Sequence, residues 1–161
     1  MIAGGVTIRP ARQEDVAAVV ALERSVAEAP HWVEAEYEAM VVESAGDVGV
    51  RRCLLVAESD GDLVGFAVGK AIGQGEVWGE LESVAVVAGA RRAGTGRALC
   101  EAVIAWCRGR GADAVELEVR SANAGAIALY ERLGFARAGM RKGYYREPVD
   151  DALLMRLKLA G

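Results

Sequence analysis

The stretch "RRAGTGRAL", residues 91–99, joins a strand-like run to a helical pattern, and the fold is best worked out from it. Before it, "SVAVV" at 83–87 is typical of a strand. Gly94 and Gly96 allow a ligand to approach the backbone closely. A helix that begins here offers unpaired N–H groups and a positive dipole end, which attract an anion. The stretch therefore predicts a strand, an anion-binding loop and a helix, with one helical face formed by Leu99, Ala102, Val103 and Trp106.

Two common nucleotide loops do not fit this stretch. Gly89 and Gly94 have the spacing of a Walker A loop, but Thr95 and Gly96 follow where Lys and Ser/Thr are required. Gly94 and Gly96 also begin a dinucleotide fingerprint, but its third glycine position is Leu99. Taken alone, the loop is therefore either an anion site of another kind or a glycine-rich turn with solvated arginines.

Outward from this unit, the hydrophobic pattern predicts seven strands and four helices. Two strand–helix–strand crossovers, at 80–120 and 113–139, predict an α/β fold with a mixed sheet and helices on both faces. "RKGYYREPVDD" at 141–151 is expected to be a loop between the last two strands. The predicted strands are 6–9, 53–59, 63–72, 77–87, 113–120, 135–140 and 152–159, and the predicted helices are 16–29, 31–46, 94–108 and 123–133.

Length and composition favour one globular domain over residues 1–161, with 53% hydrophobic and 26% charged residues. The net charge of -4 provides no global basic field, so no direct nucleic-acid partner is expected. The absence of a signal peptide and of a membrane-length apolar run predicts a cytoplasmic protein without membrane contact. Cys53, Cys100 and Cys107 lack CxxC spacing and are expected in the core, and the single His31 favours no metal site.

Two motifs in order resemble those of the GNAT acyltransferases. Arg91, Gly94 and Gly96 match R/Q-x-x-G-x-G, the acyl-CoA pyrophosphate loop of that superfamily. The second motif, N-x-x-A-x-x-L-Y followed by LGF, is met from Asn123 to Phe135. Within the superfamily, residues 117–135 are similar to the RimI family of ribosomal-protein N-terminal alanine acetyltransferases, as are "RKGYY" at 141–145 and "PHW" at 30–32.

The resemblance implies a GNAT fold, a sheet of about seven strands splayed between the fourth and fifth. It implies direct transfer of acetyl from acetyl-CoA to the N-terminal amine, expected to be that of alanine, of a protein, expected to be ribosomal. The enzyme is expected to be a monomer or a weak homodimer. The implied contacts to acetyl-CoA are Val84, Ala85, Val86, Arg91, Arg92, Ala93, Gly94, Thr95, Gly96, Arg97, Asn123 and Tyr130.

Four carboxylates fall on strands where apolar residues are expected. Strict alternation puts Glu116 and Glu118 on one face of their strand, and it puts Glu80 and Glu82 on the same face as Val84 and Val86. Burying charge is costly unless the charge is paired or used, so these residues either face solvent, pair with Arg120 or serve catalysis. A protonated amine needs a proton acceptor before it can attack. The resemblance assigns this general base to Glu118, with Glu80 as the reserve candidate.

Tyr130 is the expected general acid. It lies seven residues after Asn123, on nearly the same helix face, and a phenol within reach can protonate the departing thiolate of CoA. Backbone N–H groups of residues 84–86 could stabilise the thioester oxygen if the strand parts from its neighbour there. The residues expected on the acceptor side are Trp32, Glu80, Glu82, Tyr144 and Tyr145.

Two other functions remain open from the sequence. A small-molecule amine acetyltransferase would share the loop and Tyr130 but differ at 30–45 and 141–151, which shape the acceptor cleft. A non-catalytic acyl-CoA-binding module would tolerate the loss of Glu118 and Tyr130, so their joint presence argues against it.

Overall fold

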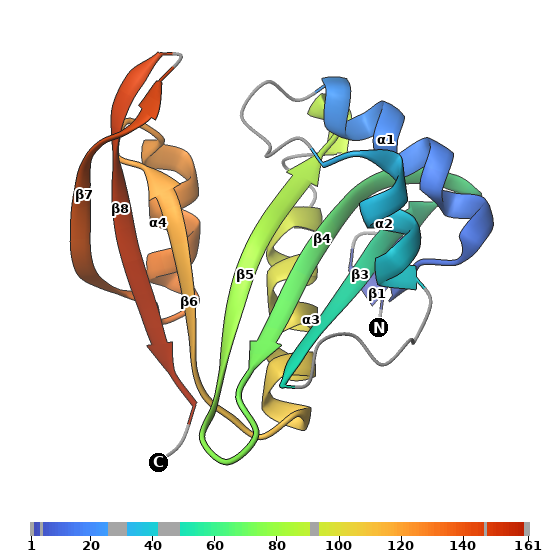
Figure 1. Cartoon of the computed structure of the whole chain (residues 1–161). Helices are drawn as coiled ribbons and strands as arrows, with labels where there is room; N and C mark the ends of the chain where they lie inside the picture. Colours follow the sequence, from blue (N-terminus) through green and yellow to red (C-terminus); the bar gives the residue numbers. More distant parts are fainter. Residues whose placement is uncertain are drawn as a thin grey trace.

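The structure is a computed structural model that describes residues 2–3, 5–25, 32–41, 49–90, 94–146 and 148–159 (Figure 1). Within these residues, eight strands form one sheet in the order β1-β2-β3-β4-β5-β6-β8-β7. All seven predicted strands are present, and the two-residue β1 is additional. The strands are β1 Ile2–Ala3, β2 Val6–Pro10, β3 Val50–Ser59, β4 Asp62–Ile72, β5 Val77–Val86, β6 Ala112–Arg120, β7 Ala136–Arg146 and β8 Val149–Lys158.

Helices cover both faces of the sheet, as predicted, and bury two separate cores (Figure 1). One core lies under α1 (Val16–Ser25) and α2 (Glu34–Val41), against β3, β4 and β5. The other lies under α3 (Thr95–Gly109) and α4 (Ala124–Arg132), and it extends across β6 and β8. The predicted ends of the first two helices, including closure at Gly46, lie outside the described residues.

The sheet divides between β5 and β6. These parallel strands pair only at Val77–Ala112, Gly79–Val115 and Glu80–Glu116, and beyond Glu80 they separate into the V seen in Figure 1. Not counting β1, this is the predicted splay between the fourth and fifth strands. The second predicted crossover, from β6 through α4 to β7, is also present, but β8 lies between β6 and β7 in the sheet.

A bulge in β5 changes which of its side chains lie on the same face of the sheet. The register with β4 shifts between Val68 and Gly69, so β5 carries an extra residue near Glu82. Val84 and Val86 therefore pack in the α3/α4 core, whereas Glu80 pairs in register with Lys70 on the opposite face. The prediction that Val84 and Val86 share a face with Glu80 and Glu82 is wrong because a bulge resets the alternation.

The predicted loop at 141–151 is mostly strand. β7 runs through both tyrosines to Arg146, and β8 begins at Val149, so this segment forms a long hairpin. Tyrosine favours extended backbone, which competes with the turn signals around it. A register shift between Arg141 and Tyr145 gives β7 a bulge, in which Gly143 has φ +62° and donates its N–H to Asp151 Oδ1 at 2.8 Å.

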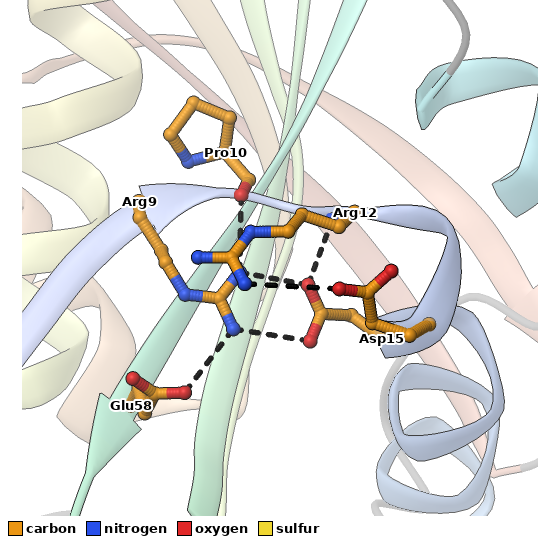
Figure 2. Close-up of polar contacts among 6 residues, drawn as sticks. Arg9, Pro10, Arg12, Asp15 and Glu58 are labelled. Atoms are coloured by element: carbon orange, nitrogen blue, oxygen red, sulfur yellow. Dashed lines mark hydrogen bonds and ion pairs between the residues drawn. The ribbon is translucent and has the colours of Figure 1, made fainter. Parts of the chain in front are cut away.

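A polar cluster ties β2 to the start of α1 and to β3 (Figure 2). The Arg9 guanidinium donates to both carboxylate oxygens of Asp15, at 2.7 and 3.1 Å, and to Glu58 at 3.2 Å. Asp15 also accepts the Arg12 N–H at 2.7 Å. The hydrogen bond from Arg9 lowers the pKa of Asp15 despite its burial. Because Arg9 bridges Asp15 before α1 and Glu58 on β3, the cluster fixes where α1 starts on the sheet.

All three cysteines are buried, as expected. Among the described residues, no helix combines the length and apolar character needed to cross a membrane. The same part of the chain holds no cluster of three or more metal-ligating side chains.

Candidate functional site

The end of β5 presents backbone N–H groups to the opening between β5 and β6. Val87 N donates to Val64 O on the β4 side at 2.9 Å. In an antiparallel ladder alternate residues point their N–H groups in opposite directions. The N–H groups of Val84 and Val86 are therefore directed towards β6, where the two strands no longer pair, while that of Ala85 faces β4.

The start of α3 lies beside this edge and fits an anion. Gly94 caps the helix with φ +80°, and the first intrahelical bond runs from Ala98 N to Gly94 O. The N–H groups of Thr95, Gly96 and Arg97 therefore lie in the first turn, which has no helical acceptors for them. A Cβ on Gly96 would lie 3.8 Å from Val86 and from Leu129 of α4, so β5, α3 and α4 meet here. Arg91, Arg92 and Ala93 lie outside the described residues.

The side chains of Thr95 and Arg97, at the start of α3, add little to an anion site. The Thr95 hydroxyl is fully buried and has no hydrogen-bond partner among the described residues. Arg97 is exposed and pairs with Glu101 one turn along the helix, at 3.5 Å. The fit to an anion therefore rests on the backbone of the first turn.

Helix α4 carries the predicted general acid. Asn123 caps the helix, and its side chain accepts the Ala126 N–H at 3.2 Å, as the sequence predicts. Tyr130 packs edge to face against Phe135, with ring centroids 5.9 Å apart. Burial, together with Cys100 and Tyr145, raises the pKa of Tyr130, so its hydroxyl keeps the proton at neutral pH.

The carboxylates of β6 are both paired. Glu116 accepts a hydrogen bond from Arg156 Nε at 2.7 Å. Glu118 is exposed, and its Oε1 lies 3.8 Å from Arg141 Nη2. Arg141 also lies over the ring of Tyr144, 5.6 Å from its centroid, so one arginine links the predicted base to the predicted acceptor side.

The carboxylates of β5 differ from each other. Glu82 receives two hydrogen bonds from Arg52, at 2.8 and 3.3 Å. Glu80 forms no ion pair within the described residues and lies where β5 and β6 begin to separate. Burial raises the pKa of Glu80; Lys70 opposes this effect, and the three nearby carboxylates, Glu82, Glu116 and Glu118, add to it.

Tyr145 of β7 lies among the groups of the predicted acceptor side. Its ring packs on Tyr144 with centroids 5.2 Å apart, and Arg120 stacks over it, 4.3 Å from its centroid. Burial raises the pKa of Tyr145, and Glu118 adds to this effect. Tyr145 in turn contributes to the raised pKa of Tyr130. Contacts through Arg141 and Tyr144 thus connect Glu118 of β6 with Tyr145 of β7.

Trp32 lies in a different setting. The Trp32 ring packs edge to face on Tyr37, with ring centroids 5.8 Å apart. The backbone N–H of Trp32 donates to the Glu23 carboxylate at 2.8 Å. Glu23 is only 1% exposed, within the α1/α2 side of the molecule. Trp32 is partly buried against the α1/α2 core, so it belongs to the packing of that side of the sheet.

Sequence reasoning missed three charged residues to which the structure gives contacts with predicted site residues or with the segments that carry them: Glu23, Arg141 and Asp150. It named Arg120 only as a possible partner of the strand carboxylates, whereas Arg120 stacks on Tyr145 and donates to Pro148 O. The partner of each residue lies outside its own element, so no local pattern reports the contact. The only usable signal was Arg141, which precedes the paired tyrosines in the stretch "RKGYY".

The two cysteines of α3 are unsuited to nucleophilic attack. Burial raises the pKa of Cys100 to about 12 and that of Cys107 to about 11. A thiol becomes a good nucleophile only as the thiolate, so both remain unreactive at neutral pH.

Comparisons with known proteins agree with this geometry. Residues 16–135 match the family described as "Acetyltransferase (GNAT) family". The chain is 36% identical over 118 residues to the [ribosomal protein bS18]-alanine N-acetyltransferase of Escherichia coli K12, covering 72% of this chain and 78% of that protein. It is 38% identical over 101 residues to N-alpha-acetyltransferase RimI of Mycobacterium tuberculosis, covering 62% of each.

The crystal structure of the ribosomal-protein-S18-alanine N-acetyltransferase from Escherichia coli superposes with a TM-score of 0.77 at 31% identity, covering 97% of this chain and 95% of that one. The match extends over the sheet and the helices that surround the opening. The chain therefore belongs to the GNAT family and is an N-acetyltransferase that uses acetyl-CoA.

Proposed function

We propose that this enzyme is a cytoplasmic N-alpha-acetyltransferase that modifies the N-terminal alanine of a ribosomal protein. The names of two relatives support this substrate class, since one acts on an alanine of protein bS18 and the other is an N-alpha-acetyltransferase. The structural observations that carry the proposal are the separation of β5 from β6 beyond Glu80 and the contact of Glu118 on β6 with Arg141, which also lies over the ring of Tyr144.

The acyl-donor side is assigned to the backbone of β5 and α3. Acetyl-CoA supplies an acetyl group activated as a thioester. The first-turn N–H groups of Thr95, Gly96 and Arg97 would hold its pyrophosphate, because they are orphan donors at the positive end of a helix. The N–H group of Val84 would face the rest of the donor along the edge of β5 that does not pair with β6.

The acceptor side is assigned to β6 and β7. The amine must lose a proton as its nitrogen forms the new C–N bond, and Glu118 is the group assigned to accept that proton. Glu118 forms an ion pair with Arg141, so a protonated N-terminus that binds Glu118 would compete with Arg141 for the carboxylate. Glu80 remains the second candidate for the base, because it is half-buried beside Glu116 and has no ion-pair partner among the described residues.

Tyr130 is assigned to complete the proton balance. When the C–S bond breaks, the departing sulfur carries a negative charge and takes the phenolic proton. The raised pKa of Tyr130 supports this role because the donor is fully protonated at neutral pH. The high thiol pKa values of Cys100 and Cys107 support direct transfer without an acyl-enzyme.

A comparison of acceptor classes tests the proposal. We would measure CoA release with a lysine-free peptide that begins with alanine, with a lysine-bearing peptide blocked at its N-terminus, and with small primary amines. The proposal predicts that the first acceptor has the highest kcat/KM, by about tenfold or more. A higher kcat/KM for the blocked peptide or for a small amine would contradict it and would favour a lysine or small-molecule acetyltransferase.

A further inference from the structure

Asp150, at the start of β8, accepts three hydrogen bonds with one carboxylate. Ser121 Oγ donates to its Oδ1 at 2.6 Å, and Asp151 N donates to the same oxygen at 2.7 Å. Ala122 N donates to Oδ2 at 3.2 Å. Two of these donors belong to the turn between β6 and α4, so a single side chain of the β7–β8 hairpin holds that turn.

Two further bonds join the same two parts of the chain. Ser121 N donates to Asp151 O at 2.9 Å, and Arg120 Nη1 donates to Pro148 O at 2.8 Å. Asn123 N donates to Arg120 O at 2.9 Å and closes the turn. The hairpin and the turn are therefore fastened by backbone and side-chain bonds together.

The turn between β6 and α4 leads to the proposed donor side of the site, and the β7–β8 hairpin carries part of the proposed acceptor side. The turn leads directly into Asn123 and the helix of Tyr130. In the hairpin, Tyr145 is the register partner of Asp150 itself, and Arg120 stacks on the Tyr145 ring. A shift of Asp150 would therefore move Tyr145 and the start of α4 relative to each other.

We propose that Asp150 is a positioning residue for acetyl transfer, which holds the start of α4 and Tyr145 in register through Ser121 and Ala122. The proposal rests on the proposed function, because it assigns Tyr130 and Tyr145 to the donor and acceptor sides. The hydrogen bond from Ser121 is the main cause that lowers the pKa of Asp150, so the carboxylate is ionised at neutral pH.

An ionised carboxylate suits this position because it only accepts hydrogen bonds. The turn presents two donors to Asp150, a hydroxyl and a backbone N–H, at separate oxygens. An asparagine has one acceptor oxygen, so either orientation turns its NH₂ group against a backbone N–H: against Ala122 N when the oxygen takes the place of Oδ1, and against Asp151 N when the amide is flipped. Asp150→Asn therefore weakens the fastening with almost no change in side-chain size.

The test compares four variants in steady-state acetylation of a peptide that begins with alanine. Asp150→Asn should raise the peptide KM and lower kcat/KM by about tenfold, the usual effect of losing a charge-assisted hydrogen bond. Ser121→Ala should show a smaller loss, and Ser121→Thr, which keeps the hydroxyl, should stay near wild type. Asp113→Asn, the same change on the exposed far end of β6, is the matched control and should have no effect.

The double variant Ser121→Ala/Asp150→Asn should be no worse than Asp150→Asn alone, because the two side chains form one contact. A purely structural role predicts another pattern: a lower melting temperature and a lower kcat from a smaller active fraction, with the peptide KM unchanged. That pattern, or additive losses in the double variant, would overturn the proposal. If Asp150→Asn does not fold, Ser121→Ala against Ser121→Thr gives the same comparison.

Failure of the proposed function would be visible separately. If the wild-type enzyme modifies a small amine and not the peptide, the proposed substrate class is wrong. The same four variants assayed with that amine then test Asp150, and a KM for the amine equal to wild type in Asp150→Asn would overturn the positioning role.

Discussion

Glu118 and Tyr130 lie in different electrostatic environments. Glu118 is exposed and pairs with Arg141, so its carboxylate is accessible. Tyr130 is held protonated because burial raises its pKa. Acetyl transfer to an amine requires a proton acceptor and a proton donor, and an accessible carboxylate and a protonated phenol are suited to these two roles.

Removing either group should stop chemistry and spare donor binding. Glu118→Gln and Tyr130→Phe should each lower kcat by roughly 100-fold or more, the scale of losing a general base or acid, while the Kd for acetyl-CoA stays within about threefold of wild type. Glu116→Gln, the same change two residues earlier on the same face of β6, is the matched control and should keep full turnover. Unchanged turnover in both Glu118→Gln and Tyr130→Phe would remove these roles.

Glu80 provides a pH-dependent test. Its pKa is raised in the folded protein, mainly by burial, so its ionised form destabilises the fold at neutral pH. Glu80→Gln should therefore raise the melting temperature at pH 7 by a few degrees, equivalent to roughly 1 kcal/mol or less. The gain should shrink as the pH falls from the raised, folded-state pKa to the ordinary glutamate value, and it should vanish below that value, where Glu80 is protonated in both states. Melting curves from pH 7 to pH 4.5 measure this, and a constant difference would contradict it.

At the scale of elements, the errors of sequence reasoning have identifiable causes. Alternation failed in β5 because the bulge opposite Val68 and Gly69 adds a residue that no composition signal marks. The loop at 141–151 was misjudged because Gly143 supports a bulge within β7 and does not end the strand. Helix caps were predicted correctly where the signal is local, as at Asn123.

The Arg9–Asp15 contact should stabilise the junction between β2 and α1. Asp15 is about one-tenth exposed, so Asp15→Asn leaves a poorly solvated arginine and should cost about 2 kcal/mol of unfolding free energy. The lowered pKa gives the sign of the pH effect: the stabilisation is complete above the ordinary aspartate value and is lost as the pH falls through the lower, folded-state value.

Urea unfolding of wild type and Asp15→Asn at pH 7 and at pH 3 measures this difference, which should be smaller at pH 3. Glu14→Gln is the matched control, because Glu14 pairs with Arg12 while both side chains are more than 60% exposed. This control should lie within about 0.5 kcal/mol of wild type. An equal loss of unfolding free energy in both variants would contradict the predicted stabilisation by the buried Arg9–Asp15 contact.

Close packing of α3 on β5 depends on one glycine. A Cβ at Gly79 would lie 2.5 Å from Cys107 Sγ and 3.0 Å from Cys107 Cβ. Gly79→Ala should therefore cost about 1–3 kcal/mol through overpacking, and adding Cys107→Ala should restore part of it. Gly75→Ala, where nothing lies within 4 Å, is the control. Equal stability of the two single variants in urea unfolding would contradict the close approach.

At the scale of the whole molecule, the sheet behaves as two wings joined by three residue pairs (Figure 1). One wing carries the backbone edge of β5 and the start of α3, and the other carries Glu118, Tyr130 and the β7 tyrosines. The element order was predictable from hydrophobic periodicity, and the splay was predictable only through the family resemblance that the two spaced motifs carry. The Arg141, Arg120 and Asp150 contacts were not, because they join residues that only the fold brings together.

The central claim is that the acetyl group goes to a protein N-terminus. The most direct measurement is tandem mass spectrometry of one peptide that begins with alanine and contains an internal lysine, after incubation with acetyl-CoA and the enzyme. The account predicts a single acetyl group on the alanine nitrogen, which is absent with Tyr130→Phe on the same time scale. An acetyl group on the lysine alone would contradict it.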